Sequence, residues 1–506
     1  KAIQNAAKLN DIGLKIKVRD ILSHPVITEM ATCLERETDL VDQSPCAGSF
    51  KPTPIYAWFF AQQFQEENHY NQSVVMDWKE DLTPRQLRLI METLIKHHDS
   101  LRLNYNRGNG ELFYNNAYLG QTDIVQSYDL AMLSPNEQDQ KLRQLSVELK
   151  SGFDIEKGLL IKAGLFNLGD RGKRVLLTAH HLVVDGVSWR ILLEDIQRLY
   201  DQIKKGQELT LALKTHSLQE WSSCLSEQGA SIAIEERAYW ERISGIDFSF
   251  PVNPRPTTLK MEADLLKDCG KKVYQLSSEE TKPLIHQSPG STGAGLYELL
   301  ITALVLTIRD FTGVNEVPLE LEGHGREEIF ENIDLTRTVG WFTSIYPALF
   351  RLAESEISQQ IESIQEQLAQ IPHHGIGYGI LQCYQGLKPS GNQKYIRFNY
   401  LGDFDGTSEN NYFSCRYEEP ESDSGRFNHL TALIDINAMI NNGQLLVTLT
   451  YGKDRLDETA INDFIHQFDL HLHEIITFMN NAPNELDKND FEMVKLSRDD
   501  MDSLFV

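Results

Sequence analysis

The stretch from residue 173 to residue 206 limits the fold more than any other part of this sequence. It opens with the apolar run "KRVLLTAHHLV", which predicts a strand over 173–183, and it ends with apolar residues at helical spacing before Gly206. The Asp185–Gly186 pair between these parts permits a tight reversal of the chain. A glycine at the far end is typical of a helix C-terminus. A strand that turns directly into an amphipathic helix predicts an α/β fold.

The chain has 506 residues, which is too long for a single hydrophobic core, because single cores stop growing near about 250–300 residues. We therefore expect two large lobes of mixed helices and strands. Residues 1–38 have the apolar spacing of short helices, and residues 39–53 have the Pro, Ser and Gly content of a flexible linker. A polar stretch at 225–231 predicts a boundary between an N-terminal lobe at 54–228 and a C-terminal lobe at 229–506.

The composition argues against several classes of partner and site. Lys and Arg number 48 against 73 Asp and Glu, a formal net charge of -25, which opposes binding to nucleic acid or to an anionic membrane. No apolar run is long enough to span a bilayer and no secretory signal pattern opens the sequence, so we expect a cytoplasmic protein. The six cysteines form no CxxC pair, which indicates reduced thiols rather than a zinc or redox site.

The adjacent histidines His180 and His181 have three interpretations: half of a metal site, buried structural imidazoles, or one general base held by its neighbour. Successive residues of a strand face opposite sides, so both rings cannot point into one cleft if the strand continues through them. The other histidine pairs lack the i, i+4 spacing of a metalloprotease helix, and we expect no metal site. Asp185 is either an acid or a carboxylate that pairs with an arginine to hold the loop, and its tight turn favours the second role.

A partner for a histidine base is available in "EGHGREEIF", which starts at Glu322. Glu322 comes at the end of the strand-like segment "VPLELEG", and the glycines around it allow close approach of backbone. Proton removal from one face of a carbon and proton return to the other face requires two groups on opposite sides. The alternative is a solvated charge near Arg326, and spacing alone does not separate the two interpretations.

The stretch "HHLVVDGVSWRIL" resembles the HHxxxDG motif of the condensation superfamily of nonribosomal peptide synthetases, in the DGxSW form of the epimerization branch. Six further segments resemble epimerization-domain motifs in the same order: "PIYAWFF" (54–60), "YELLITAL" (297–304), "EGHGRE" (322–327), "RTVGWFTSIYP" (337–347), "PHHGIGYG" (372–379) and "FNYLG" (398–402). Two positions depart from the pattern, because Tyr56 stands where glutamine is usual and Glu298 where aspartate is more usual. Neither position belongs to the expected proton-transfer pair, but both departures could alter packing at the interface between the lobes.

The resemblance implies the fold of chloramphenicol acetyltransferase, with two α/β lobes in a V-shaped pseudo-dimer. A tunnel at their junction would admit the phosphopantetheine arm of a carrier domain. The resemblance also implies that His181 is one acid/base and that Glu322, from the other lobe, is its counterpart on the opposite face. The expected supporting or substrate-orienting residues are His180, Asp185, Trp189, Arg326, Asn399 and Tyr400.

Residues 1–38 resemble the later helices of a peptidyl carrier domain, so a small all-helical remnant is expected there. The sequence begins at the lysine of an "IKAIQ" pattern, which would place the serine that carries 4′-phosphopantetheine two positions before Lys1, outside this sequence. The linker at 39–53 should let the carrier swing. The expected partners are a loaded carrier domain and a downstream condensation domain, and the protein is expected to be a monomer.

The implied substrate is an aminoacyl or peptidyl thioester, whose α-hydrogen is acidic enough to leave without a metal or pyridoxal cofactor. One of His181 and Glu322 would remove the α-proton and the other would reprotonate the opposite face, which interconverts L and D residues. The sequence leaves open which group acts on the L face and which side chain the substrate carries. The alternatives are a condensation domain that forms peptide bonds with the same histidine and an inactive domain that recruits carriers.

Overall fold

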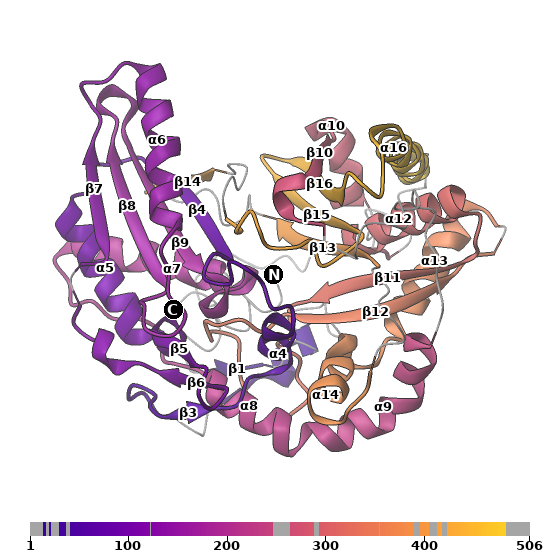
Figure 1. Cartoon of the computed structure of the whole chain (residues 1–506), viewed down its shortest axis with the longest axis horizontal. Coiled ribbons are helices and arrows are strands. Elements are labelled where there is room, and N and C mark those ends of the chain that lie inside the picture. The colour runs from indigo at the N-terminus through magenta and orange to yellow at the C-terminus, as the bar shows by residue number, and fades with distance from the viewer. Residues whose placement is uncertain are drawn as a thin grey trace, which may run out of the picture.

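A computed structural model describes residues 41–245, 264–287, 293–388, 395–403, 412–416 and 423–481, apart from 122 and 354, and short stretches before residue 37. Two α/β lobes stand side by side and diverge from a shared base (Figure 1). The expected V-shaped arrangement of two lobes is therefore present. No described helix combines the length and the apolar character that crossing a membrane requires.

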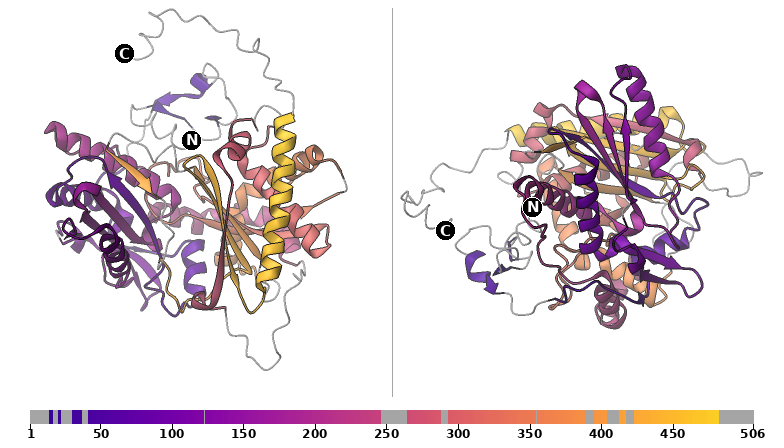
Figure 2. Two further views of the ribbon diagram at one scale, coloured as in Figure 1. Left: turned by 90° about the horizontal axis from the view of Figure 1, so that it is seen from above. Right: turned by 90° about the vertical axis from the view of Figure 1, so that its left-hand side faces the viewer.

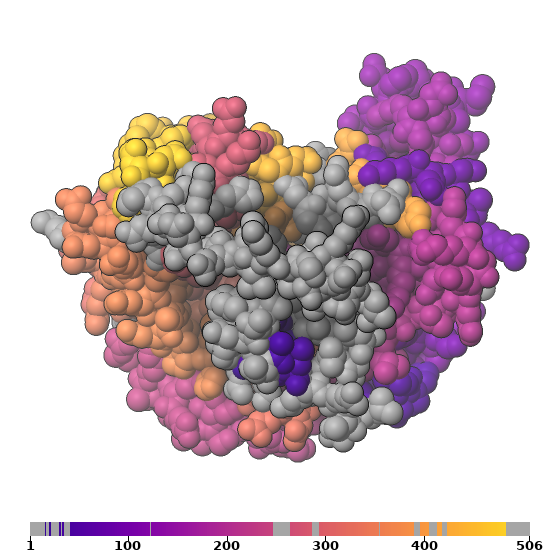
Figure 3. All heavy atoms as spheres, turned by 180° about the vertical axis from the view of Figure 1, so that it is seen from behind, coloured from indigo at the N-terminus to yellow at the C-terminus, as the bar shows by residue number. Residues whose placement is uncertain are grey.

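The first lobe is built on a five-stranded mixed sheet. Its order is β14-β4-β9-β8-β7, with bounds Phe413–Arg416, Asn71–Trp78, Lys173–His180, Ile161–Asn167 and Val125–Asp129. Helices α5 (Pro84–His97) and α7 (Gly186–Lys205) pack on each other beside it, and α6 (Pro135–Lys150) packs on β8 and β9. A small three-stranded sheet lies below in the order β3-β6-β5 (Ser49–Phe50, Glu111–Tyr114, Leu103–Asn106). Helix α6 and the ends of β7 and β8 project from the lobe (Figures 1 and 3).

The second lobe is built on a six-stranded sheet. Its order is β10-β16-β15-β13-β11-β12, with bounds Cys269–Gln275, Gln444–Gly452, Ile434–Asn441, Ile396–Asp403, Glu316–Gly323 and Ser344–Arg351. Helices α12 (Leu296–Thr312), α13 (Ile357–Ala369) and α16 (Glu458–Asn481) pack together over one face, which is clearest from above (Figure 2). Helix α10 (Ser278–Lys282) and a π-helical turn at Pro283–Gln287 lie beside α16 and β16.

Four helices form the base that joins the lobes: α4 (Pro54–Ala61), α8 (Leu218–Glu227), α9 (Gly229–Ser244) and α14 (Ile376–Tyr384). Helix α14 packs on both α9 and α4, and α4 also reaches β12 of the second lobe. Short 3-10 turns complete the described elements: Ala31–Cys33, Asp99–Arg102, Asn116–Tyr118, Gly169–Arg171, His181–Val183, Leu266–Asp268 and Pro372–Gly375. The predicted boundary at 225–231 coincides with the junction between α8 and α9.

One strand corrects the expected division into two continuous lobes. β14 (Phe413–Arg416) was expected in the C-terminal lobe at 229–506, but it pairs antiparallel with β4, from Phe413 opposite Trp78 to Arg416 opposite Val75. The ring of Phe413 is fully buried and stacks on Trp78 at 5.0 Å between ring centroids. At this edge of the sheet the Phe413 ring therefore covers apolar surface of the first lobe.

The first 38 residues also differ from the expectation of short helices, in the part that is described. β1 (Leu14–Lys15) pairs with β2 (Glu35–Arg36), and the 3-10 turn at Ala31–Cys33 comes just before β2, so two short strands are present in a segment that was expected to be helical. The apolar side chains of Ile16 and Ile21 gather there with those of Met30, Cys33 and Leu34. The other residues of the expected carrier remnant lie outside the described residues.

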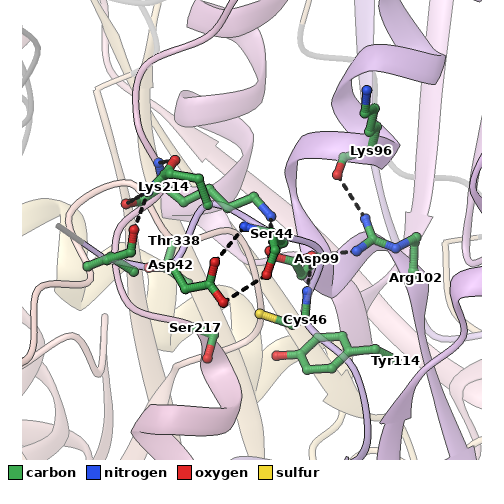
Figure 4. A network of polar contacts seen from close by, with 12 residues as sticks. Asp42, Ser44, Cys46, Lys96, Asp99, Arg102, Tyr114, Lys214, Ser217 and Thr338 are labelled. Atoms are coloured by element: carbon green, nitrogen blue, oxygen red, sulfur yellow. Dashed lines mark hydrogen bonds and ion pairs between the residues drawn. The ribbon is translucent and has the colours of Figure 1, made fainter.

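The predicted linker is attached to the first lobe over part of its length (Figure 4). The Lys214 ammonium donates to the Ser44 carbonyl at 3.0 Å and to the Asp99 carboxylate at 2.9 Å. The same carboxylate accepts from the backbone N–H of Cys46 at 3.0 Å. Residues 44–46 of the expected linker are therefore held to the first lobe by partly buried polar partners.

Candidate active site

A cleft of about 940 Å3 lies between the lobes and is lined by residues from both. Six predicted site residues line it: His181, Asp185, Glu322, Arg326, Asn399 and Tyr400. The other two, His180 and Trp189, do not line the cleft and are buried. The structure therefore brings together residues that lie up to about 220 positions apart in the sequence.

The loop that carries His181 begins one residue after the strand ends. β9 stops at His180, three residues short of the predicted 183, because the Nδ1 atom of that ring accepts from the Leu182 N–H at 3.2 Å and draws the chain into a 3-10 turn. The Tyr56 hydroxyl donates to the Leu182 carbonyl at 2.7 Å. The tyrosine that departs from the family pattern is thus part of the packing beneath this loop.

His180 is a structural residue in this arrangement. Its Nε2 atom lies 2.8 Å from the Glu67 carbonyl oxygen, and its Nδ1 atom already accepts a hydrogen bond, so both nitrogens are occupied by the neutral form. Complete burial lowers the pKa of this imidazole to about 3. These contacts hold the backbone at the start of the loop that carries His181.

The His181 ring lies between two aromatic rings at the wall of the cleft. Its centroid is 4.2 Å from that of Trp341 and 5.6 Å from that of Tyr70, and the Tyr70 ring is stacked on it at 24°. Its Nε2 atom lies 2.8 Å from the Gln72 amide nitrogen. Burial lowers the pKa of His181, so the ring is neutral at neutral pH and suited to accept a proton.

Asp185 joins the histidine loop to the second lobe. Its carboxylate caps α7 by accepting from the Ser188 N–H at 2.8 Å, and it accepts from both terminal nitrogens of Arg326 at 2.6 and 3.0 Å. It also accepts from the Phe342 N–H at 3.1 Å. Burial favours a raised pKa, but Arg326 and Ser188 outweigh it and lower the pKa of Asp185. The pairing with an arginine, which the turn position favoured, is present.

Glu322 occupies the end of β11 and faces the cleft from the second lobe. Its Oε2 atom accepts from the Asn399 amide at 2.8 Å, and the Arg397 Nε lies 3.8 Å from its Oε1. The side chain is 19% exposed. Burial raises its pKa to about 7 although Arg397 opposes the shift. This carboxyl can therefore carry a proton at neutral pH, which an ordinary glutamate does not.

The remaining predicted residues divide between the two lobes. Asn399 lies within β13, which pairs with β11, and its amide donates to Glu322 rather than pointing to a substrate. Tyr400 lines the cleft, and burial raises its pKa to about 12, so its hydroxyl stays a donor. Trp189 contacts the cleft through Gln72, because its indole N–H donates to the side-chain Oε1 of Gln72 at 2.9 Å.

Sequence reasoning missed Gln72 and Glu327. Gln72 lies on β4 opposite Ala179, beside the histidine strand, and no local pattern in "NQSVVMDW" marks it. Glu327 stands within the "EGHGRE" segment and lines the cleft with 11% of its side chain exposed. Burial raises the pKa of Glu327 to about 8, and this second acid could have been suggested by its motif. Among the described residues, no three His, Cys, Asp or Glu side chains gather as metal ligands do.

Residues 52–494 match the family model described as Condensation domain. Surfactin synthase subunit 2 of Bacillus subtilis (strain 168) is 32% identical over 513 residues, which cover 100% of this chain and 14% of that protein. Gramicidin S synthase 1 of Brevibacillus brevis is 31% identical over 522 residues, which cover 100% of this chain and 47% of that protein. The chain thus spans less than half the length of these relatives.

Solved structures give the same fold. The epimerization domain from the third module of tyrocidine synthetase B is 31% identical, with a TM-score of 0.78 over 87% of this chain and 99% of that one. The condensation domain from Monacolin K polyketide synthase has a TM-score of 0.67 at 14% identity, over 86% of this chain and 98% of that one. Because the family match runs through both lobes and the relatives align along the full chain, this protein belongs to the condensation domain family of nonribosomal peptide synthetases.

Proposed function

We propose that this domain inverts the α-carbon of an aminoacyl or peptidyl thioester presented by a phosphopantetheinylated carrier domain. The observation that carries the proposal is that an imidazole from the first lobe and a protonatable carboxyl from the second line the same cleft. Inversion at one carbon needs one such group on each face. The domain acts as an epimerase without a cofactor of its own, and the phosphopantetheine arm belongs to the carrier.

Each step of the proposed reaction moves one proton. His181 Nε2 takes the α-proton, and the electron pair of the broken C–H bond moves onto the thioester oxygen as an enolate. The carboxyl of Glu322 then delivers its proton to the opposite face, and the electron pair returns to form the new C–H bond. His181 is left protonated and Glu322 ionised, which is the state that runs the reaction in reverse or is reset by solvent.

The protonation states support this assignment. In solution a glutamate loses its proton before a histidine does, but the reaction needs a neutral His181 and a protonated Glu322 at once. Burial lowers the pKa of His181 and raises that of Glu322 to about 7. Both shifts favour a neutral His181 beside a protonated Glu322 at neutral pH. Two-sided proton transfer requires this pair of protonation states.

The comparisons also favour epimerization over peptide-bond formation. The solved epimerization domain is 31% identical to this chain, whereas the solved condensation domain of Monacolin K polyketide synthase is 14% identical. A condensation reaction uses one base and has no part for an acid opposite it, so it leaves Glu322 without a role. In the proposed pathway a downstream condensation domain consumes the D-configured thioester.

The test is solvent exchange and chirality on a loaded carrier. The protein is incubated in D2O with carrier domains that bear L-alanyl, L-leucyl or L-phenylalanyl thioesters, and the released amino acids are analysed for deuterium at Cα and for configuration. We expect D product with deuterium, and a loss of at least about 100-fold in His181→Ala and Glu322→Gln. His466→Ala and Glu331→Gln are matched controls, because both side chains are exposed away from the cleft lining.

Each contrary outcome has a distinct meaning. Carrier binding without deuterium incorporation would identify a recruiting domain and overturn the proposal. Formation of a dipeptide from two loaded carriers, without D product, would identify a condensation domain. Full epimerization by both His181→Ala and Glu322→Gln would refute the assigned proton-transfer pair.

A further inference from the structure

Gln72 and Trp189 form a short chain of hydrogen bonds that ends on His181. The Trp189 indole Nε1 lies 2.9 Å from Gln72 Oε1, and Gln72 Nε2 lies 2.8 Å from His181 Nε2. Trp189 is 5% exposed and belongs to α7, while Gln72 belongs to β4. β4 therefore contacts the imidazole directly through Gln72, and α7 is linked to it through the contact of Trp189 with Gln72.

The direction of each hydrogen bond follows from the chemistry of the groups. An indole N–H only donates, so its partner on Gln72 must be the carbonyl oxygen. The amide nitrogen that remains also only donates, so His181 Nε2 must accept from it. A neutral imidazole that accepts at Nε2 carries its proton on Nδ1.

We propose that Gln72 and Trp189 are positioning residues that fix His181 in the neutral form with its proton on Nδ1 and its lone pair on Nε2. Nδ1 is enclosed, whereas Nε2 faces Gln72, which lines the cleft, so a substrate that displaces the Gln72 amide meets the lone pair on Nε2. The inference rests on the proposed function for its catalytic consequence. The tautomer itself is a property of the resting protein.

The pair also favours a neutral ring, because a donor at Nε2 loses its acceptor when that nitrogen is protonated. Other charged and titratable groups near the ring act beside it: Asp185 favours the protonated form, while Arg326 neutralises Asp185. Tyr70 stacks on the ring, and burial raises its pKa well above its usual range. Gln72 is the neighbour that favours the neutral base by direct contact with the reactive nitrogen.

The first readout is the tautomer, which needs no substrate. In protein with ¹⁵N-labelled histidine, two-bond ¹H–¹⁵N spectra distinguish Nδ1–H from Nε2–H, and the difference spectrum against His181→Ala assigns the resonance. We expect Nδ1–H in the unaltered protein, a mixture in Trp189→Phe and Gln72→Leu, and Nε2–H in Gln72→Glu, whose carboxylate accepts. Gln140→Leu, on the exposed face of α6, is the control and leaves the spectrum unchanged.

The second readout is the pH profile of L-to-D conversion. We expect its acid limb to move up by about one unit in Gln72→Leu and by about two in Gln72→Glu, since a carboxylate stabilises the imidazolium. An Nε2–H tautomer in the unaltered protein, or an unchanged tautomer and acid limb in both Gln72 variants, overturns the inference. If epimerization fails while Nδ1–H is found and depends on Gln72, the proposed function falls and the positioning of His181 stands.

Discussion

The substitution Asp185→Ala removes a carboxylate that connects the histidine loop, the start of α7 and the second lobe. Five hydrogen bonds lose their acceptor: two from Arg326, two from Ser188 through its N–H and its hydroxyl, and one from the Phe342 N–H. The guanidinium of Arg326 keeps contacts with the Ser188 hydroxyl and the Thr338 carbonyl, at 3.2 and 3.0 Å, but no anion faces it. The variant therefore leaves a buried, uncompensated charge.

The expected loss is about 3–5 kcal/mol in the free energy of unfolding, the range for removing one partner of a buried ion pair. The upper part of that range is appropriate because the two side chains are only 2% and 4% exposed, and because the helix cap of α7 is lost as well. Asp185 is ionised in the folded state, since Arg326 and Ser188 lower its pKa against burial. Its stabilisation is thus present above the usual aspartate pKa and is lost as pH falls below it.

Urea unfolding followed by tryptophan fluorescence measures the effect at neutral pH. Glu241→Ala is the control, because it breaks the exposed pair with Arg237 and should cost less than about 1 kcal/mol. The double variant Asp185→Ala/Arg326→Met removes the orphaned charge and should regain part of the loss. A loss in Asp185→Ala no larger than the control, or a double variant as unstable as the sum of its two single variants, would refute this reasoning.

Three further predictions concern separate parts of the molecule. The pKa of Glu322 rises from its usual 4.5 to about 7 in the folded state, so the free energy of unfolding should fall as pH rises between these values. Glu322→Gln cannot ionise and should remove this fall, which is on the order of 3 kcal/mol. Urea unfolding at stepped pH measures it. Tyr56→Phe leaves the buried Leu182 carbonyl without its donor and should lower the free energy of unfolding by about 1–3 kcal/mol in the same assay. Lys214→Met removes the side-chain contact with Ser44 but leaves that of Asp99 with Cys46, so cleavage near Ser44 should become faster in limited proteolysis, and equal cleavage rates would contradict the attachment.

Local signals predicted the strand, turn and helix around the histidines well. Helix α7 runs over Gly186–Lys205, and Gly206 has the left-handed conformation expected of a terminal glycine, at φ 64°. The strand end was wrong by three residues because the His180 side chain bonds to backbone two residues on. That contact depends on how one side chain is rotated, which periodicity does not encode.

The sequence predicted only those residues of the candidate site that belong to recognisable motifs. His181 and Glu322 stand in segments with a recognisable pattern, and the structure puts both on the wall of one cleft. Gln72 could not be found in the same way, since its approach to His181 is set by the register of β4 against β9. The engagement of Asn399 by Glu322 likewise depends on the parallel pairing of β13 with β11. Such neighbours arise from sheet topology, and a single sequence does not display them.

The exchange of β14 into the first lobe has consequences for how the chain is made. β4 ends at Trp78, but the strand that pairs with its outer edge begins at Phe413. More than 300 further residues must therefore be synthesised before this edge can pair. Until then an unpaired strand edge stays available to other chains, which is an aggregation hazard. A fragment cut between α8 and α9 would keep that hazard permanently. The two lobes therefore share one sheet, and a movement that separated β14 from β4 would break the pairing of Phe413–Arg416 with Val75–Trp78.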